Sequence, residues 1–392
     1  MKKTFRRNLI AASLTMLIAA PAGAEVKVGF LATLSGPTAD VGQDQLAGFQ
    51  LALEDLGGKL GGVPAKLIVE DDLQKPDAAL NGLSKLLERD KVDIVTGLTF
   101  ANILMALQAK IAATDVPFVG SVAGPSATAG KLCKPNLFIM SWQSDAPAEA
   151  VGKYLTDKGI TRVSTLTPNF VGGKDKISGF KRFFKGEIAD EIYTPLNQLD
   201  FSAELTQVSS SDPQAVYVFY PAGALAVSFV RQYTQAGLGK KFPFYSTNSI
   251  DSFTLQGMGD AAVGAIIADA WMAGIDNPQS KKFIAAFEKR FDRTPSALAA
   301  FSYDAAMKIH AAIASLNGDV SDKKALSAAI KKAPFESLRG EFQFANNNYP
   351  IQNYHLFQVV KDDTGKSVFK PIAANILSQH KDQYAAECPL GG

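Results

Sequence analysis

Short apolar segments alternate with amphipathic segments along most of this 392-residue chain. Val26–Leu34, Val63–Val69 and Val92–Val95 have the length and apolar character of buried strands. In Ala39–Leu56 and Asn102–Ala113, by contrast, apolar residues recur at helical spacing. Strands and helices that alternate along a chain are typical of a parallel sheet covered by helices on both faces. The sequence therefore predicts the α/β class.

The same alternation begins again after Asp145. Arg162–Leu166 and Ala215–Phe219 are predicted strands, and Leu225–Ala236 is a predicted helix. A chain of this length is too long for one ordinary core. No low-complexity segment or long linker separates the two halves. The sequence therefore predicts two doubly wound parallel-sheet lobes that are joined by short crossovers.

The first 24 residues have the pattern of a secretory signal peptide. A basic start is followed by the apolar segment Leu9–Ala20 and by the small residues Ala22-Gly23-Ala24, which fit a cleavage site after Ala24. The apolar segment is too short to span a bilayer, and no later segment is long and apolar enough. We therefore expect an exported, periplasmic protein that begins at Glu25.

Charge and cysteine content narrow the possible partners. The formal net charge of +2 includes four basic residues and no acidic residue of the leader, so the remaining chain has a net charge of −2. This balance does not indicate a basic surface for nucleic acid or anionic lipid, and no nucleic-acid partner is expected. Cys133 and Cys388 lie far apart in an exported chain, where a disulfide is expected and two free buried thiols are the alternative.

The segment from Val119 to Asp145 carries an informative cluster of small residues. Gly120-Ser121-Val122-Ala123-Gly124-Pro125 follows the predicted strand Val116–Val119. Side chains of this size let a ligand lie against the backbone. Ser144-Asp145 then provides a cap for the helix predicted to begin near Pro147. This segment is predicted to form the floor of a binding site, with an ordinary turn between two strands as the alternative.

Polar, small and aromatic residues gather where the predicted strands end. In a doubly wound sheet, ligands bind beyond the carboxyl ends of the strands, where helix N-termini present free amide groups. Hydroxyl and amide side chains can orient a small organic molecule there, and aromatic rings supply contact area. The candidate ligand-binding residues are Ser35, Thr99, Phe100, Asn102, Ser121, Val122, Ala123, Phe170, Tyr220 and Asn248.

Motifs of catalysis and metal binding are missing from the sequence. His310 falls in a long predicted helix, the other two histidines fall in the tail, and no nucleophile elbow, phosphate-binding loop, dinucleotide fingerprint or metal-spaced Cys/His set is present. Asp71-Asp72 is predicted to be a solvated helix cap, and Lys174-Asp175-Lys176 a charged helix start rather than a site. The sequence therefore predicts a binding protein that is not an enzyme and uses no cofactor or metal.

Several short motifs follow one another in a set order after the leader. They are Gly29-Phe30, Leu34-Ser35-Gly36-Pro37, Gly48, Leu51-Ala52, Val69-Glu70-Asp71-Asp72, Pro76, Asp93-Ile94-Val95, Gly97, Val116-Pro117-Phe118-Val119, Asp145, Tyr303-Asp304-Ala305 and Gly340-Glu341-Phe342. Their order resembles the branched-chain-amino-acid type (type I) solute-binding proteins of ABC transporters. The resemblance implies two lobes with a three-crossover hinge, which close over a solute and deliver it to a permease in the inner membrane. A monomer is expected.

A second set of residues is similar to members of that family that bind aromatic carboxylates. It consists of Ala123-Gly124-Pro125-Ser126, Cys133, Pro135-Asn136, Phe138, Ser141-Trp142-Gln143, Thr167-Pro168-Asn169, Gly179-Phe180-Lys181 and Cys388. Amino-acid-binding members usually carry an acidic side chain near the turn that here is the neutral segment Ser246–Ser249. Because burying an ammonium group without a paired anion is costly, the expected ligand is a benzoate or a hydroxycinnamate.

Two alternatives stay open at this point. A branched-chain or other neutral amino acid is the alternative ligand, and a periplasmic ligand sensor on the same fold is the alternative function. For an aromatic acid, we expect the carboxylate on the first lobe, bound by backbone or hydroxyl groups of Thr99, Asn102, Ser121 and Ala123. The ring is expected to contact Phe100, Phe170 and Tyr220, with Trp142 and Trp271 as further aromatic candidates.

The expected lobes are discontinuous in sequence. The first lobe is expected to contain residues 25–141 plus 273–353, and the second lobe residues 143–272 plus 354–392. A disulfide between Cys133 and Cys388 is expected to tie the tail back beside the binding floor.

Overall fold

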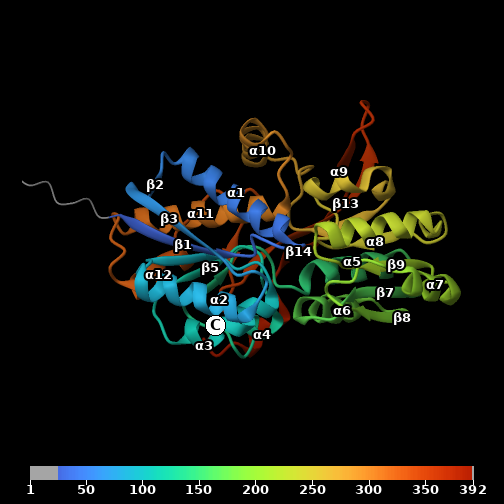
Figure 1. Cartoon of the computed structure of the whole chain (residues 1–392), viewed down its shortest axis with the longest axis horizontal. Coiled ribbons are helices and arrows are strands. Elements are labelled where there is room, and N and C mark those ends of the chain that lie inside the picture. Colours follow the sequence, from blue (N-terminus) through green and yellow to red (C-terminus); the bar gives the residue numbers. More distant parts are fainter. Residues whose placement is uncertain (1–24, 391–392) are drawn as a thin grey trace, which may run out of the picture.

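Two α/β lobes lie side by side in a computed structural model of the chain, which describes residues 25–390 (Figure 1). The predicted leader, residues 1–24, lies outside the described residues. Each lobe is built around one mainly parallel sheet with helices packed against it. This architecture confirms the predicted fold class.

A six-stranded sheet forms the centre of the first lobe, in the order β2-β3-β1-β4-β5-β6. Its strands are β1 (Val26–Ala32), β2 (Lys59–Leu60), β3 (Val63–Asp71), β4 (Ile94–Gly97), β5 (Phe118–Gly120) and β6 (Leu137–Ile139). All neighbours are parallel except β2, which is antiparallel to β3. The strand order reverses between β1 and β4, and the carboxyl ends of these two strands therefore form a crevice.

Helices cover both faces of the first sheet. Those whose side chains share the core of one face, with Phe30, Phe49 and Ile309, are α1 (Ala39–Asp55), α11 (Ala297–Ser315) and α12 (Lys323–Lys332). Those on the other face are α2 (Pro76–Ser84), its π-helical continuation η1 (Lys85–Arg89) and α3 (Ala101–Ala112). Gly48 lets α1 approach α11 closely, because a Cβ atom there would lie 2.0 Å from the carbonyl oxygen of Ala299.

An eight-stranded sheet forms the centre of the second lobe, with the order β12-β13-β11-β10-β9-β7-β8 and with β14 paired to β13. Its strands are β7 (Arg162–Pro168), β8 (Glu187–Thr194), β9 (Ala215–Val218), β10 (Phe244–Ser246), β11 (Ile266–Asp269), β12 (Gln343–Phe344), β13 (Pro350–Lys361) and β14 (Ser367–His380). Strands β7 to β11 are parallel, whereas β13 and β14 are antiparallel additions at one side. The strand order reverses between β7 and β9, which gives this lobe a crevice of its own.

Aromatic side chains attach the helices of the second lobe to opposite faces of its sheet. The ring of Phe180 stacks on Tyr217 at 4.6 Å, whereas the ring of Tyr233 meets Phe244 at 5.2 Å. The helices of this part of the chain are α5 (Ala146–Asp157), α6 (Val171–Phe183), α7 (Ser202–Ser211), α8 (Ala224–Gln235), α9 (Ser252–Met258) and α10 (Pro278–Phe291). The remaining short helices are α4 (Ser126–Ala129), η2 (Leu238–Lys240), η3 (Gly259–Ala262) and η4 (Gln383–Glu387).

The end of the chain lies against the first lobe, whereas the expected boundaries assign residues 354–392 to the second. After β14 the chain turns back, and η4 packs on α4. The Asn346 Nδ2 atom donates a hydrogen bond of 2.8 Å to the carbonyl oxygen of Ala385. Cys388 forms a disulfide with Cys133, with 5.7 Å between the Cα atoms. Tyr384 of η4 also donates a hydrogen bond of 2.8 Å to Asp145 Oδ2 of the second lobe, so the tail contacts both lobes. The expected boundaries stay a prediction.

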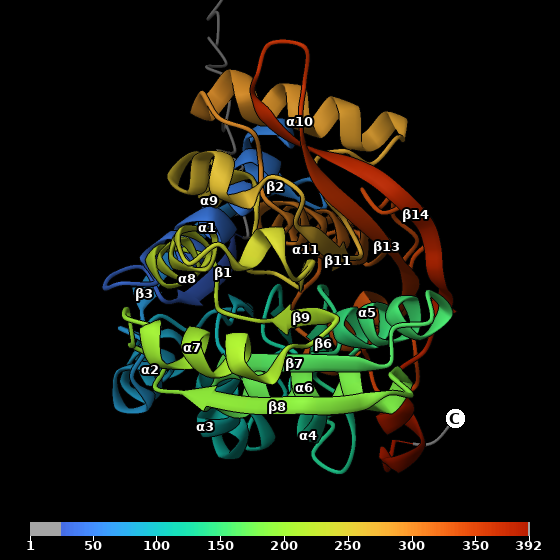
Figure 2. The same cartoon turned by 90° about the vertical axis from the view of Figure 1, so that its right-hand side faces the viewer.

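The sheet of the second lobe is extended by a long hairpin of β13 and β14 that projects beyond α9 and α10 (Figure 2). None of the helices within residues 25–390 combines the length and apolar character that a membrane crossing requires.

Candidate functional site

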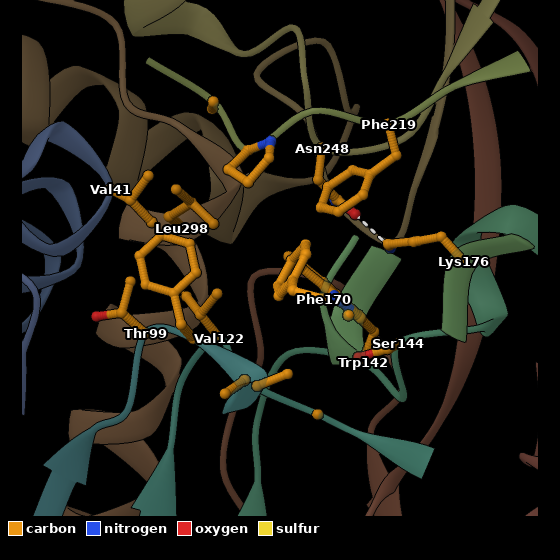
Figure 3. Close-up of a pocket in the computed structure, with 17 residues that line it drawn as sticks. Val41, Thr99, Val122, Trp142, Ser144, Phe170, Lys176, Phe219, Asn248 and Leu298 are labelled. Carbon is orange, nitrogen blue, oxygen red and sulfur yellow. Dashed lines mark hydrogen bonds between the residues drawn. The ribbon is translucent and has the colours of Figure 1, made fainter. Parts of the chain in front are cut away.

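A cleft lies where strand ends and helix ends of the two lobes meet (Figure 3). About 540 Å³ of space, part of it open to solvent, separates the surrounding atoms. The side chains and backbone that line the cleft belong to Val41, Thr99, Phe100, Ala101, Val122, Ala123, Gly124, Trp142, Ser144, Phe170, Gly172, Lys176, Phe219, Pro221, Ala222, Asn248 and Leu298.

Aromatic rings form much of the cleft surface. Phe100 and Phe170 occupy the N-cap positions of α3 and α6. The rings of Phe170 and Phe219 are stacked at 6.2 Å, and Trp142 is buried with its ring edge-on to Phe301 at 4.8 Å. Such a surface suits a flat apolar body.

The two N-cap phenylalanines leave backbone amide groups free at the cleft. Polar N-cap side chains normally accept hydrogen bonds from the first turn of a helix. A phenylalanine cannot do so, and neither helix has a side-chain cap. Ala101 and Gly172, at the beginning of α3 and α6, line the cleft. The amide groups of these first turns have no intrahelical partner and favour an anion.

The small residues of the predicted floor are explained partly by chain packing. Ala123 and Gly124 line the cleft. A Cβ atom on Gly124 would lie 2.0 Å from the carbonyl oxygen of Trp142, so the close approach of these two segments already requires a glycine.

Lys176 of α6 is buried in the cleft wall, although the sequence predicts a charged helix start there. Its Nζ atom donates a hydrogen bond of 2.6 Å to Asn248 Oδ1. It also lies 5.3 Å from the ring centre of Trp142 and 5.4 Å from that of Phe219, which is the geometry of a cation–π contact. The side chain is only 3% exposed and lines the cleft, whereas the sequence predicts a charged helix start rather than a site here.

Buried acidic groups surround this ammonium. Burial lowers the pKa of Lys176 to about 7, while Asp269, Asp145 and Asp175 act in the opposite direction. Burial also raises the pKa of Asp269 to about 7. Asn248 separates the two groups, because its Nδ2 atom donates a hydrogen bond of 2.5 Å to Asp269 Oδ2. Lys176 uses one of its three ammonium protons for the hydrogen bond to Asn248, so the other two can be donated to a group in the cleft.

Six of the ten predicted ligand-binding residues line the cleft, and four do not. The six are Thr99, Phe100, Val122, Ala123, Phe170 and Asn248. The other four are Ser35, Asn102, Ser121 and Tyr220.

Ser121 and Tyr220 lie in the interior of their lobes. The Ser121 hydroxyl accepts a hydrogen bond of 2.9 Å from Gln45 Nε2, and the residue is fully buried. The ring of Tyr220 packs against Phe201 and Phe229, with centroid distances of 4.9 and 4.8 Å. The end of a strand places a side chain near the crevice, but alternation along the strand can turn it into the core.

Ser35 and Asn102 also lie outside the cleft, in different surroundings. Ser35 is exposed and donates a hydrogen bond to Asp71, a contact that helps to lower the pKa of that carboxyl group. Asn102 is the second residue of α3, and its Oδ1 atom is buried without a hydrogen-bond partner.

Three of the four residues expected to bind a carboxylate on the first lobe, all except Asn102, use the expected groups in hydrogen bonds within the lobe. The Thr99 hydroxyl donates to Gln45 Oε1 at 2.7 Å and accepts from the backbone amide of Thr33 at 3.1 Å. The backbone amide of Ser121 donates to the carbonyl oxygen of Gly97, and that of Ala123 donates to Leu98. These groups are therefore not free to bind an anion.

Sequence reasoning missed several cleft residues because they do not lie at strand ends. Val41, Leu298 and Lys176 lie on helices, and their direction depends on how those helices pack. Pro221 and Ala222 directly follow the predicted Tyr220, so a wider window at that strand end would have included them. Trp271 lies away from the cleft, because its Nε1 atom donates to Ser280 Oγ at 2.7 Å.

Within residues 25–390, no group of three or more His, Cys, Asp or Glu side chains is arranged to hold a metal ion. The polar groups of the cleft are suited to holding an anionic organic molecule.

Comparisons with known proteins agree with this geometry. Residues 25–366 match the family described as periplasmic binding protein. The chain is similar to an ABC-transporter solute-binding protein from R. palustris in complex with benzoate, with 28% identity, a TM-score of 0.86, and 93% of this chain and 100% of that chain covered. It is also similar to a solute-binding protein from Rhodopseudomonas palustris BisB5 in complex with 3,4-dihydroxybenzoic acid, with 27% identity, a TM-score of 0.86, and coverage of 92% and 99%.

A relative that is named for amino-acid binding is similar to this chain at the same level of identity. Leu/Ile/Val-binding protein homolog 6 from Brucella melitensis is 27% identical over 378 residues, which cover 93% of this chain and 95% of that protein. The predicted resemblance to type I solute-binding proteins is confirmed by these matches. The chain belongs to the periplasmic binding protein family and is a solute-binding protein of the ABC-transporter type.

Proposed function

We propose that the protein binds an aromatic carboxylate, of the benzoate or hydroxycinnamate type, and delivers it to the permease of an ABC importer. The observation that carries the proposal is the buried ammonium group of Lys176, which lies beside aromatic rings in an otherwise mostly apolar cleft. A flat ring with one negative charge matches both features.

The ring of such a ligand would gain most of its contact area from the aromatic residues. Phe100 of the first lobe and Phe170 and Phe219 of the second all line the cleft. Aromatic rings that meet face to face or edge to face contribute about 0.5–1.5 kcal/mol beyond the burial of their area. A ligand ring held between the lobes would therefore contact aromatic side chains of both lobes.

The carboxylate would lie at the Lys176 end of the cleft. The ammonium retains protons beyond the one donated to Asn248. The uncapped beginning of α6 lies on the same side and adds its partial positive charge. This position replaces the one expected on the first lobe, where the Thr99 hydroxyl and the backbone amides of Ser121 and Ala123 are already paired.

A branched-chain amino acid is the second candidate ligand, since relatives of this chain are named as Leu/Ile/Val-binding proteins. An α-ammonium group in the cleft would need an anion and would meet the like charge of Lys176. Asp251 cannot serve as that anion, because it is buried, accepts from the backbone amide of Ser252 at 2.7 Å and caps α9. Asp269 lies behind Asn248. These contacts favour the aromatic acid.

Delivery to a permease requires a closed form that the ligand stabilises. A direct contact between the lobes lies next to Lys176. Asp175 Oδ1 accepts a hydrogen bond of 2.8 Å from the Ser126 hydroxyl, and Asp175 Oδ2 accepts one of 3.0 Å from the backbone amide of Ser126. A ligand that contacts both walls favours the closed form by its differential affinity.

We propose a monomer in the periplasm, exported by a leader that is cleaved after Ala24. A periplasmic sensor on the same fold would use the same cleft.

A thermal-shift screen of the mature chain tests the ligand class. Benzoate, 4-hydroxycinnamate, leucine, isoleucine and valine would be compared at equal concentration. A ligand that binds only the folded state raises the melting temperature, by an amount that grows with its concentration relative to Kd. We expect stabilisation by at least one aromatic acid and none by the amino acids. Stabilisation by leucine or valine alone would contradict the proposal.

A further inference from the structure

The two ends of the cleft differ in chemistry (Figure 3). Lys176, Asn248 and Ser144 lie towards one end, which we call the polar end. The side chains at the opposite end, which we call the apolar end, are those of Val41, Val122 and Leu298, together with Thr99. A carboxylate at the polar end points the rest of an aromatic acid towards the apolar end.

Thr99 does not make the apolar end polar. Its hydroxyl points away from the cleft in Figure 3. The oxygen donates to Gln45 Oε1 at 2.7 Å and accepts from the backbone amide of Thr33 at 3.1 Å.

Gln45 fixes this orientation of the Thr99 hydroxyl from behind. Its Nε2 atom donates to the Ser121 hydroxyl at 2.9 Å and to the carbonyl oxygen of Gly97 at 3.2 Å. Gln45 and Ser121 are fully buried and Thr99 nearly so. Turning the Thr99 hydroxyl towards a ligand would break its bond to Gln45 and leave a buried amide oxygen unpaired, which is unfavourable.

We infer that the cleft selects aromatic acids whose ring edge opposite the carboxylate is apolar. This inference rests on the proposed function and makes its ligand class narrower. Benzoate and 4-methylbenzoate satisfy the requirement, whereas 4-hydroxybenzoate brings a hydroxyl group against valine and leucine side chains. That hydroxyl loses its hydrogen bonds to water and gains none from the side chains at this end.

The size of the discrimination follows from the kind of wall. An apolar pocket rejects an added hydroxyl group only moderately, by a factor on the order of 100. We therefore expect 4-hydroxybenzoate to bind about 10- to 100-fold more weakly than benzoate. The methyl group of 4-methylbenzoate gains apolar contact, so this acid is expected to bind at least as tightly as benzoate.

Isothermal titration calorimetry of the mature chain with these three acids is the experiment. The expected order of affinity places 4-methylbenzoate and benzoate together and 4-hydroxybenzoate well below them. Equal or tighter binding of 4-hydroxybenzoate would overturn the inference and leave the proposed function intact. Binding of none of the acids, with binding of leucine instead, would overturn both.

A matched pair of substitutions tests the assignment of the apolar end. Val41→Thr replaces a methyl group by a hydroxyl group on this end with almost no change of shape. Val227→Thr makes the same change on α8, at a half-buried position outside the cleft. We expect Val41→Thr to reduce the preference for benzoate over 4-hydroxybenzoate by several-fold, and Val227→Thr to leave it unchanged. An unchanged preference in Val41→Thr would overturn the assignment of this end to the ring edge opposite the carboxylate.

Discussion

The two walls of the cleft carry polar side chains in opposite states of pairing. On the first lobe, the hydroxyl group of Thr99 is hydrogen-bonded to Gln45, which also donates to Ser121 in the interior of the lobe. On the second lobe, Lys176 makes one hydrogen bond, to Asn248, and directs the rest of its ammonium group towards aromatic rings. A polar residue near a crevice can therefore bind a ligand only when its hydrogen-bonding capacity is not already used by the fold.

The polar groups of the two walls also differ in how they affect the free energy of folding. The network around Gln45 consists of neutral groups with satisfied hydrogen bonds and stabilises the first lobe. Lys176, by contrast, is a buried cation whose pKa is lowered to about 7 by burial. Titratable groups with a perturbed pKa that lie in clefts are frequent at functional sites.

Replacing Lys176 by methionine should have the largest effect on ligand affinity. Methionine keeps most of the side-chain length but removes the charge that would face the carboxylate. Loss of one partner of a buried charged pair costs about 2–5 kcal/mol, so the Kd for benzoate should rise by roughly 30-fold or more. Calorimetry on the folded variant measures this effect.

Lys174→Met is the matched control for that experiment. Lys174 lies two residues earlier on the same helix and is exposed. Its replacement should leave the Kd within about twofold, because surface charges contribute little. Similar affinity in both variants and in the unsubstituted protein would contradict the contrast between the two walls.

Removing the disulfide should lower stability strongly without altering either wall. The bond joins residues that are 255 positions apart, and neither cysteine lines the cleft. The double variant Cys133→Ser/Cys388→Ser is expected to lose about 2–5 kcal/mol of unfolding free energy. Urea unfolding measures the loss, and benzoate calorimetry at 25 °C on the folded variant should give a Kd within about threefold. A large loss of affinity would mean that the tail takes part in binding.

The fold was predictable from the sequence because its signals are local. The alternation of segments such as Val63–Val69 and Asn102–Ala113 reports burial directly, whatever the arrangement of the lobes. The rule that ligands bind at strand ends led to Phe100, Phe170 and Asn248, which follow strands and line the cleft, and their contact with a ligand stays a prediction.

The parts that could not be predicted depend on contacts between distant segments. Whether Ser121 faces a ligand is decided by Gln45, which lies 76 residues earlier. Whether Lys176 is exposed is decided by Trp142, Phe219 and Asn248, which come from three other segments. The path of the tail after His380 depends on its packing against α4 and on Cys133.

The affinity for an aromatic acid should fall as the pH rises above neutrality. The pKa of Lys176 is about 7 in the free protein, and a neighbouring carboxylate raises it, so the ligand binds best where Lys176 is protonated. The buried Asp269 has a pKa raised to about 7 and gains negative charge over the same range, which acts in the same direction. The Kd for benzoate should rise by up to about tenfold per pH unit from about pH 7 to about pH 9. Calorimetry across this range measures the slope, and Lys176→Met should give a much flatter profile.

Replacing Ser121 by alanine should have only a small effect on affinity. Its hydroxyl accepts from Gln45 Nε2 at 2.9 Å and is fully buried, so its loss weakens the interior of the first lobe. The unfolding free energy should fall by about 1–3 kcal/mol, because the substitution removes a hydrogen-bond partner from a buried amide. Gln45 Nε2 keeps its bond of 3.2 Å to the carbonyl oxygen of Gly97, which places the loss near the lower value. The Kd for benzoate should change by less than about threefold, since no ligand contact is lost.

Ser144→Ala is the matched substitution at the polar end of the cleft, and there we expect affinity to change more than stability. Denaturant unfolding and calorimetry on both variants separate the two effects. A tenfold loss of affinity in Ser121→Ala at unchanged stability would show that the first lobe does supply hydrogen bonds to the ligand.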